Sequence, residues 1–141
     1  GIVKNGSCVY FMHPVFSQYA KNAPRWVKQL VVNALALLLP EPVLRLDAPS
    51  TTLATVNAQP QENRWVVHLL HYIPERRGQE FDVIEDVIPI FEVGVSIHIH
   101  EEVKNVATAP NGEALSFEQA NGRVSFILPK LEGHEMVVLD F

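Results

Sequence analysis

Cysteine and positive charge are both scarce in this sequence. Its 141 residues include one cysteine, which excludes an internal disulfide and a zinc site built from several thiolates. The 11 Lys and Arg residues form no cluster, and 16 Asp and Glu residues bring the formal net charge to -5. We therefore expect neither nucleic acid nor a membrane among the partners of this protein.

Long hydrophobic runs are also missing. The longest, Leu30–Leu39, covers ten residues and contains Asn33, whereas a helix that spans a bilayer needs about 20 apolar residues. A signal peptide has a positively charged region followed by an apolar core, and the start of the chain at Gly1–Lys4 does not show this pattern. Because no initiator Met is present, we expect a soluble piece of a longer protein. No signal fixes its compartment, and the cytoplasm is the default expectation.

Apolar residues make up 48% of the chain, which is enough for a folded core. A pair of prolines, Pro40 and Pro42, divides the chain into two zones, and we expect domains at 1–42 and 43–141. In the first zone, β-branched and aromatic residues over Ser7–Met12 predict a buried strand, in which Cys8 is a small core residue. Helical spacing of apolar residues predicts one long helix over Ala23–Leu39, and Asn22 is its expected N-cap.

The second zone has the two-residue period of strands. Trp65–Ile73 is apolar on both faces, which predicts a central strand, and buried and polar positions alternate over Val93–His100. Asn121-Gly122 is a turn signal between two short strands, Leu115–Gln119 and Arg123–Leu128, so a hairpin is expected. With seven or eight short strands and no second helix, the sequence predicts a mainly β fold. This fold is an antiparallel, immunoglobulin-like β-sandwich, preceded by one strand and one long helix left over from an α/β domain.

The histidines are the first candidates for chemistry. His98 and His100 lie two residues apart on a strand and therefore share a face, with Glu101–Glu102 as a source of a third metal ligand. His68 and His71 are three residues apart and point to opposite faces. A solvent-facing strand surface explains these residues more simply than a metal site does.

Acidic and aromatic residues supply two further candidates. Four carboxylates could in principle supply the acid/base pair of a glycosidase: Asp82, Glu85, Asp86 and Glu92. The favoured interpretation is a charged loop that runs from Pro74–Glu80 into an edge strand. Five aromatic residues would form a sugar-stacking platform if exposed, although their strand positions favour the core: Trp65, Tyr72, Phe91, Phe117 and Phe126.

One pair of residues points to a known domain. His13-Pro14 follows a strand and precedes a helix, and this arrangement resembles the last strand and helix of class I glutamine-amidotransferase-like domains. Active members carry His-Pro-Glu there, with the His as base and the Glu orienting it. This sequence has Val15 at the Glu position, so the orienting acid is absent.

The chain as a whole resembles the C-terminal region of family 42-type glycoside hydrolases, a group that includes β-galactosidases and α-L-fucosidase-like proteins. The resemblance rests on Val9–Tyr19, the following helix, Pro40–Arg45, His68–Arg77 and Val83–Pro89. Such enzymes have a catalytic (β/α)₈ barrel, an amidotransferase-like trimerisation domain without amidotransferase activity, and a small β-sandwich. The resemblance implies that the catalytic carboxylates lie upstream, in the barrel.

Accordingly, no residue of this chain is assigned a catalytic, cofactor-binding or metal-binding role, and no cofactor is expected. We expect a non-catalytic structural domain that contacts the parent's barrel and α/β domains and self-associates through its apolar helix. Two alternatives stay open. One is a carbohydrate-binding β-sandwich module with a sugar stacked on an exposed Trp or Tyr, and the other is a stand-alone metal protein that uses His98, His100 and a Glu.

Overall fold

The computed structural model describes residues 1–141, which form two compact units, Gly1–Pro42 and Val43–Phe141. Each unit is described by itself. The division falls at the prolines of the 40–42 segment, where the residue pattern also changes from helical to alternating.

The first unit is a β-hairpin followed by two helices. Strands β1 (Ile2–Asn5) and β2 (Cys8–Phe11) pair in antiparallel fashion around a turn at Gly6, whose φ of 55° suits glycine. Helices α1 (Val15–Asn22) and α2 (Arg25–Leu38) follow. Neither helix is long and apolar enough to cross a membrane.

Three predictions for this unit are wrong in detail. A second helix, α1, replaces the expected loop; it ends at Ala23, whose left-handed backbone (φ 45°) lets its N–H donate to the Tyr19 carbonyl. Asn22 is therefore the last residue of α1 and does not cap α2, which starts after Pro24 without a side-chain cap. Cys8 is exposed because β2 has only β1 beside it and no layer that covers its outer positions.

The second unit is built from two antiparallel sheets of four strands each. The first sheet has the strand order β10 (Phe117–Ala120), β11 (Arg123–Leu131), β8 (Ile90–His98), β3 (Leu44–Asp47). The second has the order β4 (Thr52–Gln59), β5 (Arg64–His71), β12 (Gly133–Asp140), β9 (Asn105–Ala109). A short 3₁₀ helix, η1 (Pro60–Glu62), joins β4 to β5.

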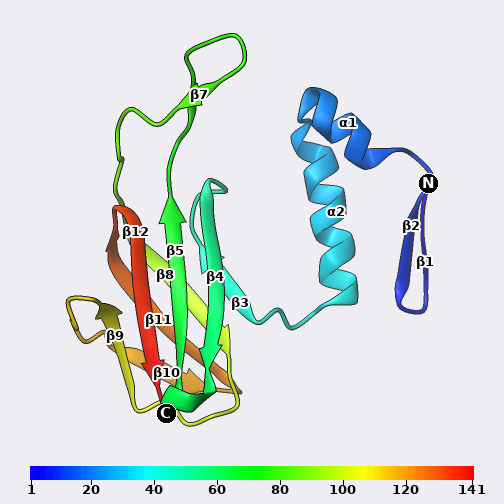
Figure 1. Ribbon diagram of the computed structural model, residues 1–141. Coiled ribbons are helices and arrows are strands. Elements are labelled where there is room, and N and C mark those ends of the chain that lie inside the picture. The colour runs from blue at the N-terminus through cyan, green and yellow to red at the C-terminus, as the bar shows by residue number, and fades with distance from the viewer. The chain divides into compact units, whose positions relative to one another are not determined.

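Both sheets bury their inward side chains in one core. Val67 and Leu69 of β5 and Val137 and Leu139 of β12 meet the β8 and β11 side chains, which include Ile97. In Figure 1 the two sheets lie as layers, with β4, β5 and β12 in front of β8 and β11. The predicted antiparallel β-sandwich is confirmed, as are the central position of β5 and the β10–β11 hairpin.

The strand order adds two details. In the constant-type immunoglobulin order, the first and second strands are neighbours in one sheet, whereas β3 and β4 lie in different sheets here. The strand after the charged loop, β8, lies between β11 and β3 and is not the expected edge strand.

The charged segment that was expected to be a loop forms a small arm. Strands β6 (Glu75–Arg76) and β7 (Asp82–Val83) pair in antiparallel fashion between β5 and β8. Figure 1 shows this arm extending beyond the end of the sandwich.

Candidate functional site

The outer face of the β10-β11-β8-β3 sheet is hollowed into a groove of about 1350 Å³, called here the outer-sheet groove. Its lining includes one polar residue from each strand in a single cross-strand row. Arg45 of β3 pairs with Ser96 of β8, which pairs with Ser125 of β11, which pairs with Glu118 of β10. Directly opposed residues of neighbouring strands lie side by side on one face, so this row crosses the whole sheet.

Small residues form the floor of the groove. Gly94 of β8 lies opposite both Asp47 of β3 and Ile127 of β11. A Cβ added at Gly94 would meet the Asp47 Cβ at 3.3 Å, so a side chain there would press on the groove wall. Because Gly94 and the two serines of the row project so little, the middle of the face remains hollow.

The serines are held in place by hydrogen bonds. The Ser96 hydroxyl accepts from the Ser125 hydroxyl at 3.0 Å and from the Arg123 Nε at 2.9 Å. The same guanidinium donates to the Ser96 carbonyl at 2.8 Å. These bonds link β11 to β8 at the floor of the groove.

A reversal of sides in β8 places an aromatic ring at one end of the groove. Ile90 and Val93 both pack on the core although they are three residues apart, which strict two-residue alternation forbids. Glu92 between them has a φ of 54°, a left-handed backbone that is uncommon for a residue with a side chain. The reversal turns Phe91 outward, where 64% of it is exposed.

Strand β11 reverses at the same level. Its residues Leu128 and Leu131 are both buried, and they pair with Val93 and Ile90 of β8. Pro129, which lies between these two leucines, lines the groove. Ile127, which precedes them, also lines it and is 59% exposed. The groove therefore has an apolar end, a small-residue floor and polar walls.

The aromatic prediction is right for most of its members and wrong for Phe91. Phe126 is buried in the core, Trp65 and Phe117 pack against it, and Tyr72 is half-buried. Phe91 alone is exposed, because the backbone at Glu92 breaks the alternation on which the prediction rested. A positive φ at a glutamate has no signal in the sequence.

The structure places the histidines of the two predicted pairs in different surroundings. The rings of His98 and His100 lie 5.0 Å apart, but no group of three or more His, Cys, Asp or Glu side chains is positioned to hold a metal ion. His71 is buried, with Nδ1 3.3 Å from the hydroxyls of Thr51 and Thr52. His68 and His71 lie on opposite sides of β5, as their spacing predicted.

One histidine contact was missed. The rings of His68 and His134 are stacked, with centroids 5.4 Å apart and the two nitrogens Nδ1 and Nε2 at 3.2 Å. The residues are 66 positions apart in sequence, and the β5–β12 register that brings them together is not readable from either strand.

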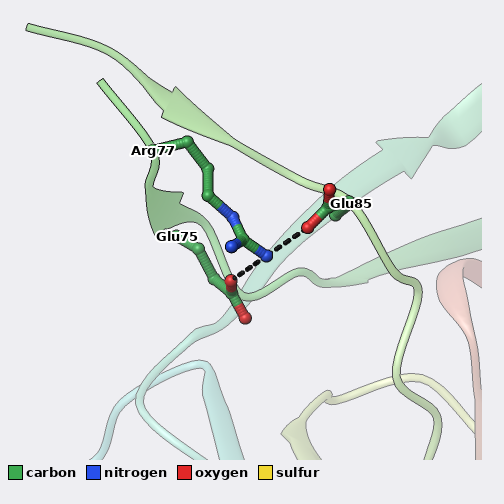
Figure 2. A network of polar contacts seen from close by, with 3 residues as sticks. All are labelled: Glu75, Arg77 and Glu85. Atoms are coloured by element: carbon green, nitrogen blue, oxygen red, sulfur yellow. Dashed lines mark hydrogen bonds and ion pairs between the residues drawn. The ribbon is translucent and has the colours of Figure 1, made fainter.

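The carboxylates of the arm are paired with arginines. Arg76 Nε lies 2.8 Å from Asp82 Oδ1. Figure 2 shows the Arg77 guanidinium between Glu75 and Glu85, with Nη2 2.8 Å from Glu75 and in contact with Glu85. These ion pairs link the two ends of the arm. Glu92, the last of the predicted carboxylates, lies outside the arm and lines the outer-sheet groove.

We expect Arg77→Gln to lower the free energy of unfolding by about 1 kcal/mol or less, because exposed ion pairs are weak. Both partner carboxylates and Arg77 itself are more than half exposed. Urea unfolding of the variant and of the original chain checks this, once at low salt and once in about 0.5 M NaCl, which screens exposed charges well. A difference of several kcal/mol, or one that survives the salt, would contradict it.

His13 is exposed between β2 and α1, and Val15, at the expected Glu position, is buried. His13 therefore has no orienting carboxylate at that position.

No family model and no curated protein matches the chain. Solved structures do. Over 100% of its length the chain matches α-L-fucosidase isoenzyme 2 from Paenibacillus thiaminolyticus, with 34% identity and a TM-score of 0.95. In fold and in sequence, the chain is similar to one part of a glycoside hydrolase. It spans 22% of the length of that fucosidase.

A second likeness concerns the fold alone. A cycloisomaltooligosaccharide glucanotransferase from Paenibacillus sp., solved with cycloisomaltoheptaose, matches 68% of this domain at 19% identity and a TM-score of 0.52. The domain spans 16% of that chain. Neither likeness singles out family 42 or β-galactosidases.

Proposed function

We propose that this chain is a non-catalytic accessory domain of a glycoside hydrolase, and that the parent enzyme acts on α-L-fucosides. The observation that carries the proposal is the match of the whole chain to one part of a much longer fucosidase. It favours a fucosidase parent over the β-galactosidase-like parent that the sequence suggested.

The carboxylates of the domain support a non-catalytic role. The general acid of a glycosidase has its pKa raised by its surroundings, burial above all. The carboxylates that line the groove, Asp47, Glu92 and Glu118, are all exposed.

The first unit has the surface of a segment that packs on other domains. Trp26 and Leu37 are eleven residues apart on one side of α2, and Leu35 lies on another side; all three are more than half exposed. Val27 and Ala34 face the unit's own interior. Large apolar side chains exposed close together mark a contact surface, so we propose that α2 contacts the parent's upstream domains or a second copy of the chain.

The proposal predicts two results. An antiserum against the chain should detect a native polypeptide several times heavier than 15.8 kDa, because a (β/α)₈ barrel alone adds about 250 residues. The isolated chain should release no nitrophenol from 4-nitrophenyl α-L-fucoside or β-D-galactoside, whereas the heavy polypeptide should hydrolyse the fucoside. A native band near 15.8 kDa, or activity in the isolated chain, contradicts the proposal. Activity of the heavy polypeptide on the galactoside alone would restore the β-galactosidase-like parent.

A further inference from the structure

We propose that the outer-sheet groove is a binding site for a neutral oligosaccharide. The proposal rests on the proposed function only in its choice of sugars. Its structural basis is the combination of an exposed aromatic ring, a hollow floor of small residues and polar walls on one sheet face.

The apolar end of the groove suits the carbon-bound hydrogens of a sugar ring. Phe91 and Ile127 are 64% and 59% exposed and both line the groove, as does Pro129. Pyranose rings present an apolar face of C–H groups that stacks on an aromatic ring, and the gain comes from apolar area removed from water. The backbone at Glu92 holds Phe91 in this outward position.

The polar walls suit hydroxyl groups, which both donate and accept hydrogen bonds. Arg45 and Asp47 stand on the β3 side, and Glu118 stands on the β10 side. The Arg45 guanidinium donates on the β3 side, and carboxylates accept on both sides. Together they can bind hydroxyls along an extended ligand. Since acidic residues outnumber the single arginine among the charged lining residues, a polyanion is disfavoured and a neutral glycan is favoured.

The shape of the groove favours a chain of sugars over a docked protein. It crosses all four strands, which is about 14 Å, and small residues hollow its floor. Apolar side chains that suit protein contact are exposed on α2 of the first unit, and none of them lines the groove: Trp26, Leu35 and Leu37.

The test is a titration of the chain by calorimetry and by ¹⁵N-HSQC spectra, with 2′-fucosyllactose, β-1,4-galactotriose and isomaltotriose as probes. We expect at least one probe to bind with a millimolar or tighter Kd and to shift the amide signals of Gly94, Ser96 and Ser125. Phe91→Ala should raise the Kd about 3- to 10-fold, the range of one aromatic contact. Ser125→Leu, which fills the floor, should abolish binding.

Phe81→Ala is the matched control, because Phe81 is 61% exposed and lies outside the groove. It should leave the Kd unchanged, and a preserved HSQC pattern shows that each variant is folded. The proposal is overturned if none of the three probes binds at concentrations up to about 50 mM, well above the millimolar Kd that is expected. Binding that neither groove variant weakens, or a loss of binding in Phe81→Ala equal to that in Phe91→Ala, overturns it as well.

A third result would assign the groove to protein contact. If the groove amides shift when the parent's upstream domains are added and no probe shifts them, the face is a domain interface and the proposal fails. The proposed function is tested separately, by the mass of the native polypeptide. A heavy polypeptide without sugar binding refutes only the groove proposal, and a band near 15.8 kDa with sugar binding refutes only the hydrolase context.

Discussion

Leu69→Ala should lower the free energy of unfolding of the sandwich by about 2–5 kcal/mol, the usual cost of truncating a buried leucine. Leu69 lies on the interior strand β5, has no solvent exposure and belongs to the core that both sheets share. The cost combines lost apolar burial with a cavity that the surrounding strands cannot fully close.

Urea unfolding followed by tryptophan fluorescence measures this change. The sequence has two tryptophans: Trp65 packs against the core and lies edge-on to Phe141, whereas Trp26 is 62% exposed in the first unit. In a Trp26→Phe background, the signal therefore reports the sandwich. Leu53→Ala is the control, because Leu53 is 68% exposed on the neighbouring strand β4, and it should cost less than about 1 kcal/mol. Equal losses in the two variants would contradict the assigned core.

The isolated chain should self-associate at tens of micromolar, and Trp26→Gln combined with Leu37→Gln should raise the dissociation constant of that association at least about tenfold. Burying a large apolar side chain contributes about 1.5–3 kcal/mol, and tenfold corresponds to about 1.4 kcal/mol. Both side chains are more than 60% exposed on the same side of α2.

Sedimentation velocity over a range of concentrations checks this expectation. The original chain should show a mass above 15.8 kDa that rises with concentration, and the double variant should remain near 15.8 kDa. Leu53→Gln, a change of the same kind at an equally exposed leucine of the sandwich, should associate like the original chain. A monomeric original chain, or a Leu53→Gln variant that loses association while the double variant keeps it, would contradict a role for α2.

The sequence predicted the elements whose signals are local. Alternation over Val93–His100 predicted the buried and polar sides of β8, and the Asn121-Gly122 turn predicted the β10–β11 hairpin. The helix α2 was predicted within two residues at its start and one at its end. In each case neighbouring residues within one turn or one strand carry the pattern.

The candidate site could not be predicted, because its parts meet only through strand register. Arg45, Ser96 and Ser125 come from three strands spread over 81 residues of sequence, and none is unusual in its own strand. The stacked pair His68 and His134 was missed for the same reason. Helix α1 was missed because it is only eight residues long and no side chain caps its start, so the Ser, Thr, Asp or Asn start signal is absent.

The reversal at Glu92 has an evolutionary consequence. In a regular strand, residue 91 would point into the core, and each change of its side chain would alter stability. Here Ile90 and Val93 carry the packing on either side, and Phe91 is left outside. Natural variants of this domain can therefore exchange the residue at 91 for other aromatic or polar types without repacking the interior, so that the surface of the groove and thermal stability diversify independently.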